Sequence, residues 1–465
     1  MIKKIFSHSL IYGIAPQIPR LASFFVLPLI TPFLTENDYG IYGIVTAYTL
    51  MLTSIKDLGL KVVLSNTFFK HNNHIKKIWG QLYGFLYLWN IVFAALVFLF
   101  LYFIIPEEAS DNKFKIILLT TIPIIFFGQT MSIGQTYYQL KKKPFQIAIR
   151  AAIIGSLAIF LNYYTIAVLK IGYMGFFWSA FMSAMLYNIS YWIPINYKEK
   201  IKPIFKFKKR FIKSSLKISL PLIPHNMAAY LINISDRVVM ERLEVSTANI
   251  GSYSFAANFG NLFASITQAT NTAISPFLLG HYKNKEDLQA RNLIFLWQIG
   301  VYVLFFVAAL WLKEIFTIIV KNETLAALYP MAIILIMAQS YRPMYVGGLQ
   351  KLFYENKTSQ LFKVTLLAGV INVGLNLIFI PIYGYIFAVF STYFTFLIQG
   401  YIFYFFKSFK AINPVKFYPF FWLFLQLILS VAVYCLRDVV PLYKVVISIV
   451  VIAVGASALY KLSKK

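Results

Sequence analysis

Charged side chains are scarce in this chain. Asp, Glu, Lys and Arg make up 13% of its 465 residues, whereas hydrophobic residues make up 59%. A soluble globular protein carries about 25% charged and roughly 45–50% apolar residues. The mean hydropathy is +0.70. These values exclude a soluble enzyme with one buried core and also a disordered or fibrous chain, and they predict a membrane protein that crosses the bilayer many times.

Cysteine and histidine are almost absent. The single cysteine, Cys435, lies in an apolar run, so it can form neither an internal disulfide nor a Cys-based metal site. The five histidines include no pair with metal-ligand spacing, and no Ser–His–Asp or paired-carboxylate pattern indicates a catalytic site. The phosphate-binding motif G-x-x-x-x-G-K-[ST] is also missing. We therefore predict a protein that is not an enzyme, with no metal, no cofactor and no ATP hydrolysis by that route.

Fourteen apolar segments are long enough to cross a bilayer, whose ~30 Å hydrocarbon core needs about 20 helical residues. We predict an all-α polytopic membrane protein with these segments as transmembrane helices. The weakest boundary lies near residues 381–385, where only Pro381 and Gly384 interrupt a long apolar stretch. The predicted spans are residues 8–33, 40–66, 79–105, 115–139, 145–169, 172–195, 214–240, 250–276, 291–312, 326–350, 362–382, 384–406, 417–436 and 441–460.

Acidic residues are fewer still, since 16 Asp and Glu stand against 43 Lys and Arg, giving a formal net charge of +27. The basic residues lie between apolar runs, so they indicate orientation in the membrane rather than nucleic-acid binding. With the N-terminus inside, the inner loops are basic and the outer loops hold acids such as Glu107 and Glu108. We expect both termini to lie in the cytoplasm and the basic stretch 197–213 to face anionic lipid.

The first and seventh spans share a P-x-I-P motif, at residues 16–19 and 221–224. Each motif follows a basic inner segment and precedes a Gly-x-Tyr sequence that opens the next span. The two halves therefore enter the membrane in the same direction, which predicts two six-helix lobes related by a parallel pseudo-two-fold repeat. The expected organisation is an N-terminal lobe 1–196, a basic cytoplasmic linker 197–213, a C-terminal lobe 214–406 and two additional transmembrane helices in 407–465.

Interrupted helices at matching positions of two halves mark the substrate site in transporters. Proline bends a helix and frees backbone carbonyl groups. We therefore predict hinges at Pro16, Pro19, Pro221 and Pro224. The alternative is that proline is simply frequent in membrane helices.

Several charged residues lie within predicted spans: Arg20, Lys56, Asp57, Arg342 and, opposite Arg20 in the repeat, His225. An Arg or Lys at the bilayer centre costs at least ~2.5–3.5 kcal/mol, so such residues usually face a cavity or a partner. We predict that these five bind substrate in a central cavity. For Lys56 the alternative is a salt bridge with Asp57.

The adjacent pair Asp236 and Arg237 lies toward the outer end of its span. Its plainest explanation is an ion pair at the membrane interface.

The eighth span carries a polar stripe whose spacing alternates between four and three residues, so its members share one helical face. Such side chains can bond neighbouring helices, at about 0.6 kcal/mol each. The length of the stripe favours instead a water-filled cavity, with Asn258, Asn261 and Gln268 as substrate-binding residues. The stripe consists of Ser254, Asn258, Asn261, Ser265, Gln268, Thr272 and Ser275.

A cavity with more cations than anions suits an anionic solute. The planar guanidinium of Arg pairs well with phosphate, and amides and hydroxyls can bond sugars. An inside-negative potential favours export of negative charge by about 2.3 kcal/mol per charge per 100 mV. These features favour a diphosphate-linked glycolipid as substrate.

The chain resembles the Wzx-type polysaccharide flippases of the multidrug/oligosaccharidyl-lipid/polysaccharide exporter superfamily. The resemblance lies in the two halves, the P-L-I-P motif at 221–224, S-D-R at 235–237 and I-G-S-Y-S-F-A at 250–256. It implies alternating access that carries undecaprenyl-diphosphate-linked oligosaccharide, for O-antigen, capsule or exopolysaccharide, from the cytoplasmic to the periplasmic leaflet. It also implies that Arg20, Lys56 and Arg342 are lumen cations, and that membrane lipids and a glycan polymerase are partners.

Other functions remain open. A peptidoglycan-precursor (lipid II) flippase would also present cations to a diphosphate, and the last two spans resemble those of such flippases in number. A cation-coupled multidrug exporter needs an intramembrane carboxylate, yet the first span holds Arg20 and Asp57 follows Lys56. A glycan polymerase or ligase generally has a large outer loop, which this sequence lacks. A membrane scaffold would need neither a central Arg nor the polar stripe.

Overall fold

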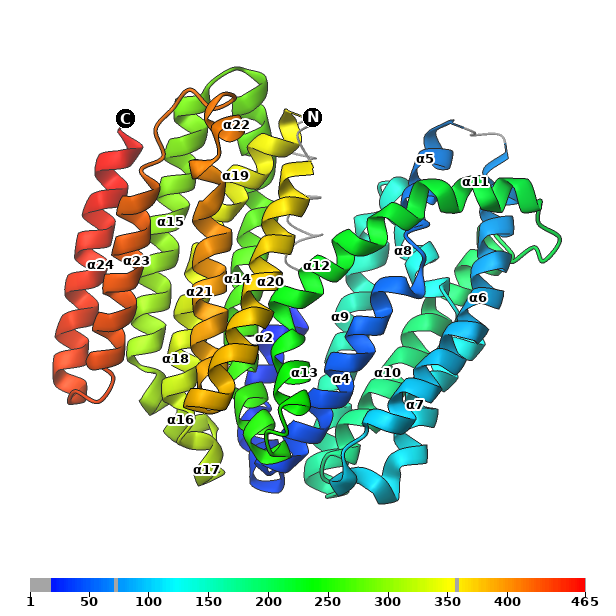
Figure 1. Cartoon of the computed structure of the whole chain (residues 1–465), viewed down its shortest axis with the longest axis horizontal. Coiled ribbons are helices and arrows are strands. Elements are labelled where there is room, and N and C mark those ends of the chain that lie inside the picture. The colour runs from blue at the N-terminus through cyan, green and yellow to red at the C-terminus, as the bar shows by residue number, and fades with distance from the viewer. Residues whose placement is uncertain (1–17, 71–73, 356–358, 465) are drawn as a thin grey trace. The chain divides into compact units, whose positions relative to one another are not determined.

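The computed structural model describes residues 18–70, 74–355 and 359–464. Within these ranges the chain folds into helices and contains no strand (Figure 1). The described residues divide into two compact units, the first comprising residues 18–230 and the second residues 231–464.

In the first unit, two clusters of buried apolar side chains fill the space between the helices. Trp79 and Tyr83 on α6 are fully buried in one cluster, and Phe93 on the same helix lies in the other. The helices are α2 (Ile18–Phe24), α3 (Leu27–Ile30), α4 (Glu36–Lys56), α5 (Lys61–Lys70), α6 (Ile75–Ile104), α7 (Lys113–Phe127), α8 (Thr130–Leu140), α9 (Pro144–Tyr163), α10 (Met174–Ile193) and α11 (Lys209–Ser219).

Helix α12 (Ile223–Asn233) runs from the first unit into the second. The helices of the second unit are α13 (Ser235–Arg242), α14 (Thr247–Lys283), α15 (Asp287–Leu310), α16 (Leu312–Ile319), α17 (Glu323–Ala326), α18 (Tyr329–Ala338), α19 (Arg342–Tyr354), α20 (Ser359–Tyr383), α21 (Phe387–Tyr401), α22 (Lys407–Lys410), α23 (Pro419–Cys435) and α24 (Pro441–Ser463).

Among the described residues, six helices are long and apolar enough to cross a membrane, and α7 with α8 forms a seventh candidate that bends by 52°. The other predicted spans coincide with shorter or broken helices, so the count of fourteen stays a prediction. The weak boundary near Gly384 is a true helix break, because α20 ends at Tyr383 and Gly384 has a φ of +79°.

The C-terminal helices α23 and α24 lie beside α15 in the second unit (Figure 1). Tyr302 of α15 donates to the carbonyl oxygen of Trp422 at 2.9 Å, and Tyr401 of α21 donates to Gln426 at 2.9 Å. These bonds and the burial of Trp422 fix α23 to the lobe. The opposite faces of both helices expose large apolar side chains such as Phe424 and Ile449, which suits contact with lipid.

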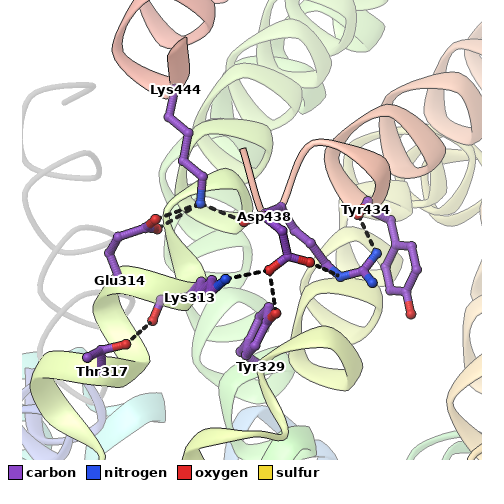
Figure 2. A network of polar contacts seen from close by, with 8 residues as sticks. Lys313, Glu314, Thr317, Tyr329, Tyr434, Asp438 and Lys444 are labelled. Atoms are coloured by element: carbon purple, nitrogen blue, oxygen red, sulfur yellow. Dashed lines mark hydrogen bonds and ion pairs between the residues drawn. The ribbon is translucent and has the colours of Figure 1, made fainter. Parts of the chain in front are cut away.

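Polar contacts tie the turn between α23 and α24 to α16 and α18 (Figure 2). Lys444, whose side chain is fully buried, bonds both carboxylate oxygens of Glu314 at 2.8 and 2.9 Å. Asp438 accepts hydrogen bonds from Lys313 and Tyr329, both at 2.7 Å. The bonds from Lys313 and Tyr329 lower the pKa of the Asp438 carboxyl. The two additional helices are therefore an integral part of the second unit.

Candidate functional site

Lys56 and Asp57 lie where α4 ends and α5 has not yet begun. The chain turns through Leu58 and Gly59, both with positive φ (+49° and +68°). A side chain on Gly59 would collide with the carbonyl oxygen of Ser219, so the turn needs a glycine there. The carboxylate of Asp57 accepts a hydrogen bond from the amide of Gly59 at 2.9 Å. Asp57 thus stabilises the turn, and within the described residues no ion pair joins it to Lys56.

The break between α7 and α8 lies against the break after α4. Gly128 has a φ of +52°, and the side chain of Gln129 donates to the carbonyl oxygen of Lys56 at 3.0 Å. Trp89 donates to the carbonyl oxygen of Ile55 at 3.2 Å. A helix can be interrupted within a membrane only if its freed backbone groups find new partners, and these side chains supply them. The two broken helices therefore form one hydrogen-bonded junction inside the first unit.

The predicted hinge prolines occupy different surroundings. Pro16 lies outside the described residues, whereas Pro19 packs so closely on Gly155 of α9 that a methyl group there would collide with its ring. Pro221 lies in a 3-10 turn, and Pro224 lies in the first turn of α12, where a missing amide costs no helical hydrogen bond. Both are exposed. Their role as hinges stays a prediction.

Among Arg20, Arg342 and His225, the structure describes the side chain of Arg342 only. The backbone of Arg20 belongs to α2 and that of His225 to α12, but both side chains lie outside the described set. Arg342 begins α19 after a short 3-10 turn; its Nε donates to Gln339 at 3.0 Å, and its guanidinium lies 5.7 Å from the ring of Tyr341. No carboxylate among the described residues forms an ion pair with Arg342. Its terminal nitrogens are suited to an anion.

The polar stripe of the eighth span lies on the long helix α14, where its members differ in burial and in hydrogen bonding. Ser254 is buried and bonds Arg237, and Ser275 accepts a hydrogen bond from Gln350 of α19 at 2.7 Å. Asn258, Asn261 and Gln268 instead expose their amides. Uncharged amides facing lipid would lack partners, so their exposure favours an aqueous surface. The stripe is therefore anchored near both ends, and between them the exposed Asn261 and Gln268 flank the buried Ser265.

The second unit also contains a buried polar cluster around Asp236, which is 1% exposed. The carboxylate accepts hydrogen bonds from Tyr253 of α14 at 2.5 Å, Asn376 of α20 at 2.6 Å and Thr392 of α21 at 3.0 Å. Four elements of the unit converge on this one carboxylate. A buried carboxylate needs such donors, since the charged form is otherwise very costly in a low-dielectric interior.

Further polar side chains extend the cluster. Ser235 donates to Asn372 at 3.2 Å, Asn372 accepts from Asn376 at 3.4 Å, and Ser391 bonds the side-chain oxygen of Asn376. Carboxylate, amide and hydroxyl oxygens are the ligands that hard cations prefer, and a single carboxylate can alternatively carry a proton. Across the described residues, however, no three His, Cys, Asp or Glu side chains gather as metal ligands.

The sequence-based interpretation of Asp236 and Arg237 as an interfacial ion pair is wrong. No contact within ion-pair distance joins these two side chains, and both are buried. Arg237 bonds Ser254 through Nε at 2.8 Å and lies 5.5 Å from the ring of Tyr253. Neighbouring residues on a helix do not face each other. Sequence reasoning missed the cluster, although two asparagines four residues apart in the eleventh span were a signal for a shared polar face.

Comparison with known proteins places these features in context. A protein family described as polysaccharide biosynthesis protein matches residues 1–280. Among solved structures, the chain is similar to a lipid II flippase MurJ in an inward closed conformation, with 16% identity, a TM-score of 0.76, and coverage of 98% of this chain and 99% of that one. No curated protein matches.

The chain is also similar to inward-facing and outward-facing structures of a multidrug resistance MATE family transporter of the MOP superfamily. The inward-facing structure has 12% identity, a TM-score of 0.64, and coverage of 88% of this chain and 96% of that one. The outward-facing structure has 13% identity, a TM-score of 0.59, and coverage of 89% and 96%. At these identities the likeness shows a shared fold alone.

Proposed function

Because the chain belongs to the polysaccharide biosynthesis protein family, we propose that it is a Wzx-type flippase for undecaprenyl-diphosphate-linked oligosaccharide. It would carry this lipid from the cytoplasmic to the periplasmic leaflet of a bacterial inner membrane by alternating access. The observation that carries the proposal is that this family assignment coincides with a MurJ-like and MATE-like fold over nearly the whole chain. A protein with this fold in polysaccharide biosynthesis is suited to moving the lipid-linked intermediate across the membrane.

The exposed polar surface supports a glycan as part of the cargo. Asn258, Asn261 and Gln268 present amides that can exchange hydrogen bonds with sugar hydroxyls. Arg342, which lacks a carboxylate partner in the described structure, can pair with the diphosphate. We assign Arg20, Lys56 and His225 to the same path by their predicted depth in the membrane.

The buried Asp236 cluster supports a coupling role. A carboxylate that four elements enclose can exchange its protein donors for a proton or a hard monovalent cation. Either event would change the bonds between α13, α20 and α21. We propose that such an event biases the lobe between two conformations, so that an ion gradient and the membrane potential both drive export.

Two other transport functions are ranked lower. A lipid II flippase would share the fold and a diphosphate, and the MurJ structure is similar throughout its length. The family assignment favours polysaccharide intermediates over peptidoglycan precursors. A multidrug exporter fits the fold, and Asp236 supplies an intramembrane acid. Arg342, which forms no ion pair with any described carboxylate, disfavours a cationic drug. We also propose that both termini are cytoplasmic and that a glycan polymerase receives the product.

The test is the sidedness of lipid-linked glycan in cells that lack this protein. We expect the glycan to accumulate on the inner leaflet, and we expect wild-type protein to restore its outer-leaflet exposure. The variants Arg20→Ala and Arg342→Ala should insert normally yet fail to restore it, whereas Lys115→Ala on a predicted outer segment should restore it fully. Normal outer-leaflet glycan in the deletion strain, with no redundant flippase, would contradict the proposal.

A further inference from the structure

The basic stretch after α10 is fixed to the first unit. Ile201 is fully buried, and the amide of Ile204 donates to the carbonyl oxygen of Gly80 on α6 at 2.8 Å. A methyl group on Gly84, one turn further along α6, would collide with the backbone of Ile204. These glycines allow an extended segment to lie directly on a helix. The segment therefore gives α11, which follows it, a defined position in the same unit.

Helix α11 has a buried face and a cationic face. Ile212, Ser215 and Ser219 are buried. Lys209, Lys213 and Lys217 follow one another at four-residue spacing on another face, so these residues form a row about 12 Å long along the helix axis.

No carboxylate balances this row. Along the described chain, none of the cations Lys209, Arg210, Lys213 and Lys217 takes part in an ion pair. Like charges at four-residue spacing repel each other and destabilise a helix. An anion bound along the row would remove this repulsion.

An open groove runs beside the cationic row. Its cavity volume is about 740 Å³. One wall is apolar and comes from Phe85 of α6, Phe207, and Ile212 and Leu216 of α11. The other lining residues include the four cations Lys209, Arg210, Lys213 and Lys217. Charge and apolar surface thus lie side by side in one concave site.

The residues around the groove suit a membrane interface. Phe205, Ile218 and Leu220 are 54%, 58% and 43% exposed, directly beside basic residues. A helix that combines exposed apolar side chains with a cationic face typically lies in the headgroup region of a bilayer. A soluble anion has no apolar surface to bury against this wall.

We propose that this groove binds the headgroup of an anionic phospholipid from the adjoining leaflet. The phosphate lies among Lys209, Lys213 and Lys217, and the first methylene groups of the acyl chains lie against Phe85 and Leu216. Charge complementarity selects an anionic lipid over a zwitterionic one. The site lies wholly within the first unit and binds lipid whether or not the protein transports glycan, so it stands independently of the proposed function.

The test measures lipid selectivity of the purified full-length protein in nanodiscs that contain phosphatidylcholine and a minor fraction of phosphatidylglycerol. Native mass spectrometry reports which lipid remains bound. We expect a preference for phosphatidylglycerol that falls about tenfold in the variant Lys209→Gln/Lys213→Gln/Lys217→Gln. The matched control Lys283→Gln/Lys285→Gln/Lys461→Gln removes the same charge from exposed lysines elsewhere and should keep the preference.

Two results would overturn the proposal. One is an unchanged preference in the α11 variant; the other is full displacement of phosphatidylglycerol by inorganic phosphate, which would make this a site for a soluble anion. If the triple variant does not fold, the single variant Lys213→Gln tests the lipid preference instead. It should lower the preference several-fold, and an unchanged preference would reject the site.

Discussion

At the scale of single residues, the chemistry of a side chain was predictable but its partner was not. Hydropathy places Lys56 and Asp57 in a span, yet the structure uses the Asp57 carboxylate and the Lys56 carbonyl oxygen in a turn. That turn depends on the positive φ of Leu58 and on Gln129, which lies far away in sequence. The sequence likewise suggests an ion pair between Asp236 and its neighbour Arg237. In the structure, the hydrogen-bond partners of Asp236 come from three other helices.

The variant Asp236→Asn tests the coupling role. The amide has nearly the same shape but carries no charge and cannot accept from three donors as a carboxylate does. We expect export to fall about tenfold or more, as for other intramembrane ionisable residues with a functional role, while the protein still inserts and folds. Asp111→Asn, an exposed acid, is the control. Full export by Asp236→Asn would reject Asp236 as the coupling group and leave the potential as the driving force.

The variant Asn261→Phe tests the polar surface of α14. A bulky apolar ring there removes an amide and narrows an aqueous path, so glycan export should fall severalfold at unchanged protein abundance. Asn284→Phe introduces the same ring at the exposed C-terminal cap of α14 and should leave export unchanged. Unimpaired export by Asn261→Phe would mean that this face does not line the path. Export is measured as outer-leaflet glycan in the deletion strain.

At the scale of helices, hydropathy located the membrane segments but not their interruptions. Among the described residues, six helices and the bent pair α7–α8 are candidate membrane spans, whereas α4–α5 and α7–α8 each break within a single predicted span. Breaks follow from local φ values and from tertiary caps such as Gln129 and Trp89. A hydropathy average over about 20 residues contains information on neither the φ values nor the tertiary caps. The break at Gly384 was predictable because glycine and proline mark it directly.

The variant Gln129→Leu tests the junction between the two broken helices. It removes the donor to the Lys56 carbonyl oxygen and leaves a half-buried acceptor without that partner. We expect a loss of about 1–3 kcal/mol in unfolding free energy, seen as a lower unfolding temperature of the purified protein. Gln135→Leu removes a longer bond to the half-buried Tyr187 and should matter less. Equal stability of Gln129→Leu and wild type would show that the junction contributes nothing.

The contribution of the turn between α23 and α24 to folding stability should depend on pH. Bonds from Lys313 and Tyr329 lower the folded-state pKa of Asp438 below its unfolded value of about 3.9. A lowered carboxyl pKa stabilises the fold above that unfolded value, and the gain is lost as pH falls through the folded pKa. Because the side chain is 45% exposed, the effect is small.

Asp438→Asn should therefore lower the unfolding temperature slightly at pH 7, and the difference from wild type should shrink as pH falls below about 3.9 and disappear below the folded-state pKa. Thermal unfolding across this pH range measures it. Glu107→Gln, on a surface turn, is the control and should match wild type throughout. A difference that grows at low pH would contradict the assigned sign.

At the scale of the whole molecule, the sequence predicted the class of protein and its family. Composition and span length indicated an all-helical membrane protein, and motifs at 221–224, 235–237 and 250–256 indicated a polysaccharide exporter. The family match confirms a polysaccharide biosynthesis protein, and the MurJ-like and MATE-like fold confirms the all-helical class, whereas export stays a proposal. The identity of the glycan was not predictable, because amides and guanidinium groups recognise hydroxyls and phosphates without specifying one sugar.

The central claim is that this chain moves a diphosphate-linked glycolipid across a bilayer. The most direct test places the purified protein in vesicles with a fluorescent polyprenyl-diphosphate oligosaccharide and measures the fraction accessible to an external, membrane-impermeant glycosidase. We expect wild-type protein to make the inner-leaflet pool accessible and Arg342→Ala to leave it protected. An inner-leaflet pool that stays protected from the enzyme, under an imposed ion gradient and membrane potential, would contradict it.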